Sequence, residues 1–213
     1  MEMFDVIRQR RAVRAYKADP VSVASLRTLI EAASWAPSAM NSQAWHFVVI
    51  TDRNVLDEIS QSAKRWLLEK DPELAANPNM RTNFNDPTYD ILHHAPVMIA
   101  IATPSPAKWG VEACALAAEN LMLAATAAGL GSCWIGLAEG WLNSPAGRKT
   151  LGLAENERVI APIVVGYPKA LPHATSRHQP RITWIEPDSK MTEDGERLEP
   201  ISPSGLYGTL IHP

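Results

Sequence analysis

Two neighbouring stretches decide the fold of this chain: Arg10-Arg11-Ala12-Val13-Arg14 and Ala36-Pro37-Ser38-Ala39-Met40-Asn41-Ser42-Gln43-Ala44-Trp45. The first places three guanidinium groups within five residues. A guanidinium group stays charged at physiological pH, and its planar fork of N–H donors matches the oxygens of a phosphate. The second is a polar, turn-forming segment between two apolar runs. In this order, close to the N-terminus, the two stretches predict a site for a small anion.

The arginines alone leave two other interpretations open. Basic side chains at the end of a short helix also favour the helix dipole. A run such as Arg8 to Arg11 also suits a nucleic acid, but no stacking aromatic residues or further basic runs accompany it. The net charge of the chain is −3, so its positive charge is local. A local cationic site on a mildly acidic chain suits a small anion better than a polymer, and we expect no nucleic-acid partner.

Length and composition predict one globular domain. The chain has 213 residues, of which 46% are hydrophobic, and prolines become frequent after Pro162. We therefore expect a folded body over residues 1–168 and an extended arm of the same domain over residues 169–213. Acidic residues near the N-terminus argue against a signal peptide, and no apolar run is long enough for a membrane span. Two cysteines in apolar segments make no disulfide framework, which favours the cytoplasm.

Hydrophobic periodicity gives the expected elements. Helices are predicted over residues 2–9, 21–35 and 54–69, over 109–128, and from 143 onward. Buried strands are predicted over residues 45–50, 96–102, 131–136 and 159–166. The polar, proline-containing stretch 71–90 is expected to be a mobile loop, with room for a short helix, that gates a substrate. This alternation predicts an α/β or α+β sandwich. The nearly uncharged helix 109–128 further predicts cover from a second subunit.

The sequence predicts no catalytic triad and no metal site. His93 and His94 are adjacent, so their side chains do not face one another, and no His or Cys pair has zinc spacing. Cys133 is interpreted as a small core residue. The tryptophans are interpreted as core or interface residues, although Trp66, Trp109 or Trp141 could also cover the substrate side of a site.

The two opening stretches resemble the nitroreductase family of FMN-dependent oxidoreductases. The pattern is Arg-Arg-x-Val-Arg, followed about two dozen residues later by Ala-Pro-Ser-x-x-Asn-x-Gln-x-Trp. Later segments fall in the family's order, so the resemblance covers roughly Phe4 to Trp184. The chain has Ala12, Ala39 and Ala44 where the family often has a hydroxyl residue, a second serine and a proline. Backbone contacts alone would remain at Ala12 and Ala39.

The resemblance implies an α+β fold: a three-layer α-β-α sandwich around a mixed, mostly antiparallel sheet, in a domain-swapped homodimer. Two FMN sites would lie at the dimer interface. The implied cofactor-binding residues are Arg10, Arg11, Ala12, Arg14, Pro37, Ser38, Ala39, Asn41, Gln43, Gly136, Leu137 and Arg177.

The resemblance also implies a role for each of these groups. Arg10 and Arg11 would hold the FMN phosphate, while Arg14 would give electrostatic support beside the flavin ring. The stretch from Pro37 to Asn41 would line the ring from the other subunit. Backbone N–H groups of Gly136 and Leu137 would approach the flavin N5. Alternatively, Gly136 stands at the end of a strand that needs a small residue there and has no contact with the flavin.

Arg177, with His178, resembles the late basic residues that close on the phosphate. An equally good interpretation is that both residues lie on a solvent-exposed arm and do not contact the phosphate.

The implied function is an FMN-dependent oxidoreductase of nitroreductase type. NAD(P)H would reduce the flavin and leave, and a small organic oxidant such as a nitroaromatic compound or a quinone would enter the same cleft, in a ping-pong scheme. The flavin carries the hydride chemistry, so no side-chain acid or base is expected. The alternatives are an FMN oxidase or dehydrogenase acting on a small metabolite, an enzyme that degrades its flavin, and a non-enzymatic anion-binding protein.

Overall fold

The computed structural model of this chain describes residues 2–104 and 108–185. The chain divides into two units, Met1–His173 and Ala174–Pro213. The described part of the second unit, residues 174–185, contains no helix or strand. All helices and strands below belong to the first unit.

Within the described residues, four strands form one sheet in the spatial order β1-β2-β4-β3. They are β1 (His46–Ile50), β2 (Val97–Pro104), β3 (Gly131–Trp134) and β4 (Glu157–Gly166). Each neighbouring pair is antiparallel, and a parallel bridge joins Ala12 to Ser132. The predicted mixed, mostly antiparallel sheet is therefore confirmed.

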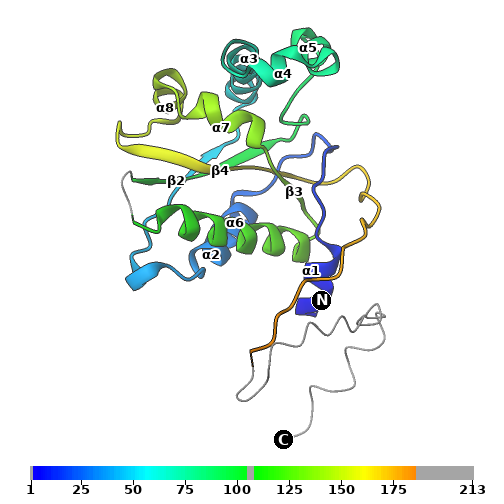
Figure 1. The fold of residues 1–213 in the computed structure, drawn as a ribbon, viewed down its shortest axis with the longest axis vertical. Helices are drawn as coiled ribbons and strands as arrows, with labels where there is room; N and C mark the ends of the chain where they lie inside the picture. Colours follow the sequence, from blue (N-terminus) through cyan, green and yellow to red (C-terminus); the bar gives the residue numbers. More distant parts are fainter. Residues whose placement is uncertain (1, 105–107, 186–213) are drawn as a thin grey trace, which may run out of the picture. The chain divides into compact units, whose positions relative to one another are not determined.

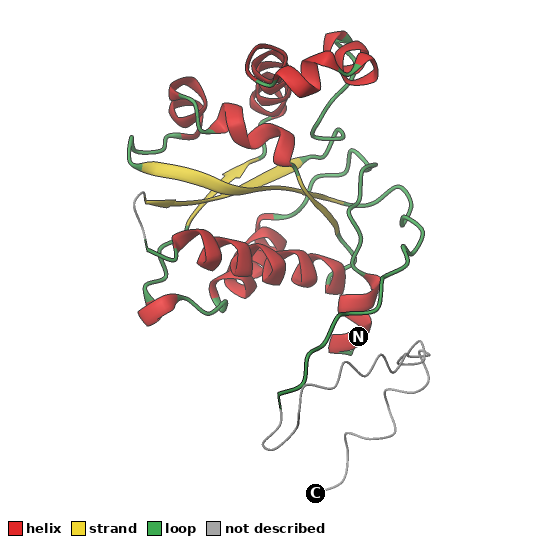
Figure 2. Ribbon diagram, viewed as in Figure 1, coloured by secondary structure: helices red, strands yellow, loops and turns green. Residues whose placement is uncertain are grey.

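Helices cover both faces of this sheet and produce three layers (Figures 1 and 2). On one face lie α2 (Val23–Ser34) and α6 (Gly110–Ala127), with α1 (Met3–Gln9) at one end of α6. On the other face lie α3 (Arg53–Lys70), α7 (Gly136–Leu142) and α8 (Pro145–Leu151). Each face buries its own hydrophobic cluster, one around Leu121 and Ile163 and one around Ile59 and Val164. The predicted α+β sandwich is confirmed.

The stretch 71–90, predicted as a loop with room for one short helix, is more helical than expected in its first part. Residues 71–85 form two short helices, α4 (Pro72–Ala76) and α5 (Pro78–Asn85). Asp71 and Asn77 cap them by accepting hydrogen bonds from backbone N–H groups, and a proline follows each cap. Proline is favoured at the first position of a helix, so these prolines start helices and do not interrupt them.

Two strand predictions also need correction. The third strand was expected to run from 131 to 136, but β3 ends at Trp134 and Gly136 opens the short helix α7, which the sequence did not predict. The first strand was expected to be buried, but β1 lies at the edge of the sheet and leaves His46 and Val49 exposed. An edge strand is covered on one side only, and its apolar composition does not reveal this.

Helix α6 is buried on one side only within a single chain. Ala117, Ala118 and Leu121 pack onto the sheet, whereas Val111 and Leu116 are 50% and 46% exposed. The expectation that this apolar helix is covered all round is therefore not met by the chain alone. No helix in the described residues is long and apolar enough to cross a membrane.

Candidate functional site

The segment that carries the arginines is fixed to the sheet by backbone hydrogen bonds. It leaves α1 at Arg10, and the Val13 N–H donates to the Ser132 carbonyl at 3.0 Å. Further along, the Lys17 N–H donates to the Tyr167 carbonyl at 2.8 Å. The segment therefore runs between β3 and the residues that follow β4, with little freedom to shift.

Side-chain packing fixes the same segment. Val13 is buried against Gly131, where an added Cβ would lie 2.7 Å from Val13 Cγ2. Tyr16 is buried as well, and its hydroxyl donates to the Val13 carbonyl at 2.7 Å. Because Val13 points inward in an extended segment, Arg14 points outward, and its side chain is exposed. The fold thus presents Arg14 beside β3 on a rigid support.

The arginines cluster beside β3. Arg11 Nη1 donates to the carbonyls of Arg8 and Arg10, so its side chain curls back onto the end of α1. Arg10 Nε lies 3.5 Å from Glu119 Oε1 on α6. Burial raises the pKa of the Cys133 thiol on β3, and the nearby charges of Arg14 and Arg10 offset part of that rise. A raised pKa leaves Cys133 a thiol, in keeping with a core role.

Two buried polar atoms in this region have no hydrogen-bond partner among the described residues: Arg11 Nε and Ser132 Oγ. Both belong to the place where the arginine segment meets β3, since Ala12 is bridged to Ser132. A buried donor without a partner costs about 1–3 kcal/mol. A water molecule, an ion or a bound ligand is what supplies the partner of such an atom. Sequence analysis missed Ser132, because nothing in Gly131-Ser132-Cys133-Trp134 separates it from an ordinary strand residue.

The turn after β3 presents open backbone. Gly136 and Leu137 form the start of α7, and the preceding residue, Ile135, provides no side-chain cap for their N–H groups. Apart from its chain neighbours and the backbone of α7 itself, no described heavy atom lies within 4 Å of the position that a Cβ on Gly136 would take. Packing within the chain therefore does not require glycine here, and the space beside the backbone is free for another molecule.

The stretch from Pro37 to Gln43 forms a tight, strained turn. Met40, Asn41 and Gln43 have φ values of 55°, 54° and 46°, a left-handed conformation that non-glycine residues rarely adopt. Ser38 holds the turn together: its carbonyl accepts from the Asn41 N–H, and its Oγ accepts from the Gln43 N–H at 3.0 Å. Strain of this kind costs about 1–3 kcal/mol per residue and gathers at functional sites.

This turn lines an open surface groove of about 360 Å³ together with the first turns of α6. The lining residues are Pro37, Ser38, Ala39, Trp109, Glu112, Ala113 and Leu116. The sequence-predicted residues therefore separate into two groups. Arg10, Arg11, Ala12 and Arg14 gather with Gly136 and Leu137 around β3, whereas the residues from Pro37 to Gln43 gather at the start of α6.

The two groups lie toward opposite ends of α6. Val13 packs on Gly131, just beyond the C-terminal end of that helix, whereas the Pro37 turn lies against its first turns. An 18-residue helix is about 27 Å long. In Figure 1, α1 and the pale blue turn after α2 lie accordingly at different ends of α6. Arg177 belongs to the second unit, where its Nη1 donates to the Thr175 carbonyl and hydroxyl.

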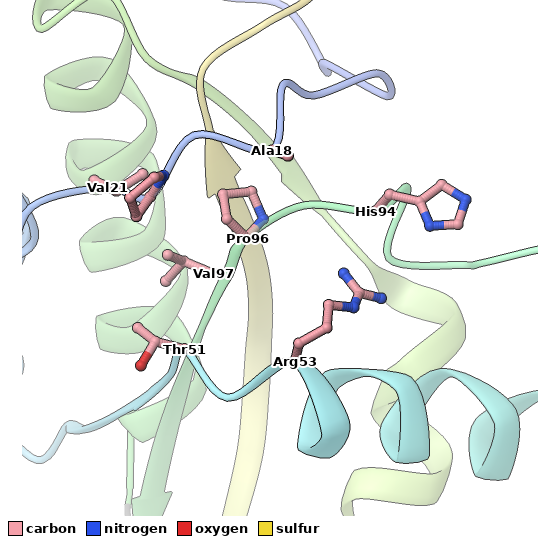
Figure 3. A pocket seen from close by; sticks show the side chains of 8 residues that line it. Ala18, Val21, Thr51, Arg53, His94, Pro96 and Val97 are labelled. Atoms are coloured by element: carbon pink, nitrogen blue, oxygen red, sulfur yellow. The ribbon is translucent and has the colours of Figure 1, made fainter.

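A larger cavity, of about 490 Å³, lies elsewhere and includes none of the sequence-predicted site residues among its described lining. Figure 3 shows Arg53 and His94 on one side and Val21 and Val97 on the other. Its Arg53 and His94 side chains already have a partner, because Asp90 Oδ2 lies 3.1 Å from Arg53 Nη2 and 3.3 Å from His94 Nδ1. The described residues contain no group of three or more His, Cys, Asp or Glu side chains that could hold a metal.

Comparison with known proteins decides the family. Residues 7–167 match the sequence profile described as the Nitroreductase family. The chain belongs to the nitroreductase family. A nitroreductase of Bacteroides fragilis, solved with bound FMN, has the same fold, with a TM-score of 0.77 and 30% sequence identity. The match covers 87% of this chain and all of that one.

Two curated relatives are similar over most of their length. A provisionally named NADH dehydrogenase/NAD(P)H nitroreductase of Archaeoglobus fulgidus is 30% identical over 178 residues, which is 79% of this chain and 86% of the relative. The nitrobenzene nitroreductase of Ectopseudomonas oleovorans is 28% identical over 199 residues, with 76% of this chain and 85% of the relative covered. This nitroreductase-family protein has the predicted α+β, three-layer fold of its subunit.

Proposed function

We propose that this nitroreductase-family protein is an FMN-dependent oxidoreductase that passes reducing equivalents from NAD(P)H to a small organic oxidant. One observation carries the proposal. The segment with Arg10, Arg11 and Arg14 is fixed against β3 beside two buried polar atoms that have no partner among the described residues, Arg11 Nε and Ser132 Oγ. A ligand with a phosphate and hydroxyl groups would give the Arg11 Nε–H a hydrogen-bond acceptor and the Ser132 hydroxyl a hydrogen-bond partner.

The residues present fit flavin mononucleotide. Arg10 and Arg11 provide guanidinium donors for the phosphate. The free space beside Gly136 allows a planar ring to approach the backbone of α7. FMN, when bound, supplies the hydride chemistry, so the protein needs no catalytic acid or base. Arg14 stands exposed on the rigid segment and, with FMN bound, would stabilise negative charge on the flavin ring.

We further propose that the active form is a homodimer. Because the two groups of site residues lie toward opposite ends of α6, one chain does not complete a site by itself, and a second copy would bring its Pro37 turn to the first copy's arginines. Exposed apolar residues support this arrangement. Trp35 and Met40 are 80% and 100% exposed, and Val111 and Leu116 add apolar surface on α6. Exposed apolar residues that lie together mark interaction surfaces.

The proposed location is the cytoplasm, where Cys114 and Cys133, both buried and free, would stay reduced.

Spectroscopy and rapid kinetics test the proposal in sequence. The purified protein is expected to be yellow, with flavin absorbance. Anaerobic mixing with NADH or NADPH should bleach that absorbance, and nitrobenzene or menadione should restore it. A colourless protein that does not take up added FMN would overturn the cofactor assignment. A yellow protein that neither nicotinamide reduces would favour an oxidase or dehydrogenase of the same fold.

A further inference from the structure

Tyr16 contacts the backbone of the arginine segment through its hydroxyl group. The hydroxyl donates to the Val13 carbonyl at 2.7 Å, and no other donor among the described residues bonds to that carbonyl. Arg14 lies between the two residues, and its own N–H and C=O make no backbone hydrogen bond in the described part of the chain. The Val13 carbonyl belongs to the peptide unit that leads into Arg14. The Tyr16 hydroxyl therefore fixes the direction in which Arg14 leaves the backbone.

The aromatic ring of Tyr16 is held separately from its hydroxyl. Tyr16 is 2% exposed within the single chain, so its burial does not depend on a second copy. A Cβ added to Gly166, at the end of β4, would lie 2.9 Å from Tyr16 Cδ1, so the ring packs closely there. An antiparallel bridge also joins Tyr16 to Pro168. Removing the hydroxyl alone should therefore leave the ring in place and release only the peptide unit before Arg14.

The charge of Arg14 has no counter-charge among the described residues. Arg14 forms no ion pair with any of them, and its side chain is exposed. Three titratable groups feel its charge, and all three are uncharged at neutral pH. Burial raises the pKa of the Tyr16 hydroxyl and of the Cys133 thiol, whereas burial and the charge of Arg14 lower the pKa of His93. The guanidinium group can thus act on a bound anion, with an effect that depends on where the side chain is held.

We propose that Tyr16 is a positioning residue for the flavin site: its hydroxyl fixes the peptide unit before Arg14, so that the guanidinium group stands where it would stabilise the reduced flavin. The inference rests on the proposed function and deepens it, because it names the group that holds the electrostatic support in place. Coulomb energy falls with distance, so a cation that moves away from developing charge stabilises that charge less. The hydroxyl would thereby raise the flavin potential without touching the flavin.

Tyr16→Phe removes the hydroxyl and keeps the ring. In the FMN-loaded protein, this variant should shift the redox equilibrium of the flavin toward the oxidised form by about two- to fivefold, or about 9–21 mV, because one hydrogen bond of ordinary strength is lost. Equilibration with a reference dye measures the shift. FMN retention should stay within about twofold, since Arg10 and Arg11 remain in place for the phosphate. A fall in retention with an unchanged potential would mean that the hydroxyl is merely structural and would overturn the proposal.

NMR relaxation on the full chain without FMN tests the same contact independently of the flavin. In Tyr16→Phe, the order parameter of the Arg14 amide should fall from about 0.85, the value of rigid backbone, toward about 0.6. The order parameter of Lys17 should stay high, because its N–H donates to the Tyr167 carbonyl at 2.8 Å. An unchanged value at Arg14 would show that the hydroxyl does not fix this peptide unit.

A double-mutant cycle with Arg14→Ala assigns the change in potential to Arg14. In the Arg14→Ala background, Tyr16→Phe should not move the potential further, because the charge that the hydroxyl positions is gone. Equal shifts in both backgrounds would overturn the proposal.

Ser144→Ala is the matched control. It removes the hydrogen bond from the Gly147 N–H to Ser144 Oγ that caps α8, a loss of stability similar to that of a buried hydroxyl contact. The flavin potential should not change in this control. An unchanged potential in Tyr16→Phe would overturn the positioning role alone. A wild-type protein that binds no FMN, or whose flavin NAD(P)H does not reduce, would overturn the proposed function and this inference with it.

Discussion

Arg10 and Glu119 lie side by side, with Arg10 Nε 3.5 Å from Glu119 Oε1. Both side chains are partly exposed, and an ion pair of this kind contributes about 0–1 kcal/mol. A phosphate offers Arg10 shorter, charge-assisted bonds in a bidentate geometry. The pair with Glu119 therefore holds Arg10 near β3 without competing strongly for its guanidinium group.

Arg10→Ala is expected to weaken FMN retention about tenfold or more, because a charge-assisted bond contributes about 1.5–3 kcal/mol. The flavin reduction potential should stay the same, since a phosphate contact acts equally in both redox states. Fluorescence titration with FMN at several salt concentrations measures the loss. Glu119→Gln is the control and should change the dissociation constant by less than about fivefold, the limit set by a 1 kcal/mol ion pair.

Arg14→Ala should lower the reduction potential of the flavin. A cation about 4 Å from developing charge contributes about 1–4 kcal/mol at a partly exposed site, and 1.4 kcal/mol corresponds to about 30 mV for a two-electron couple. Reduction by NAD(P)H should slow accordingly. Equilibration with a reference dye measures the potential. Equal potentials in the variant and the wild type would remove Arg14 from the mechanism.

Gly136→Ala should weaken FMN binding without destabilising the fold. The protein has room for the added methyl group, so the melting temperature is expected to stay within about 2 °C. FMN retention should fall by about fivefold or more, the equivalent of 1 kcal/mol, because the methyl group occupies the space proposed for the ring. If retention is unchanged, Gly136 does not face the flavin.

Gly131→Ala is the matched contrast to that variant. Its Cβ would lie 2.7 Å from Val13 Cγ2, and overpacking of this kind costs about 1–3 kcal/mol. Thermal unfolding of the apoprotein should shift downward by several degrees, at about 2–4 °C per kcal/mol for a chain of this size. A stable Gly131→Ala variant would show that the arginine segment can move off β3.

Asp90 should make stability fall in acid. Burial raises the pKa of Asp90, but hydrogen bonds from Ser60, from backbone N–H groups and from Arg53 together hold it below its ordinary value. A depressed carboxyl pKa contributes stability above the unfolded value, about 3.9, and that contribution is lost as the pH falls through the folded value.

In Asp90→Asn, the free energy of unfolding at neutral pH should fall by about 1–3 kcal/mol, because hydrogen-bond partners of the carboxylate lose its charge. The dependence on pH below about 4 should also become flatter. Urea unfolding between pH 3 and pH 7 checks both effects. If the free energy of unfolding depends on pH in the same way in Asp90→Asn and in the wild type, other groups cause the loss of stability in acid.

Val111→Asp should break the proposed dimer. Val111 is an exposed apolar residue on α6, and a carboxylate at a desolvated interface is costly. Light scattering should show a shift toward monomer, and FMN retention should fall with it, because each proposed site uses residues of both copies. A wild-type monomer that holds FMN at nanomolar concentration would contradict this prediction.

The sequence by itself determined the family-level pattern and the main elements. Arg10 to Arg14 and the turn from Pro37 to Gln43 are local patterns, so their residue types predict phosphate contact and turn chemistry without any tertiary information. Helices α2 and α3 were predicted from their periodicity, because one stripe of each helix must face the sheet. Helix α6 was predicted from a long, nearly uncharged apolar run.

Tertiary structure decided what depends on residues that are distant in sequence. The unpartnered hydroxyl of Ser132 becomes visible only when Ala12 pairs with β3. Trp109 and Trp66 have the same side chain, but the Trp66 ring packs closely over Gly140 and is partly buried, whereas Trp109 lies exposed beside the Pro37 turn. The prolines at 72 and 78 are a different case: Asp71 and Asn77 directly precede them, so this helix-start signal is local and was present in the sequence. Burial and close approach are properties of pairs of residues, and only the fold brings those pairs together.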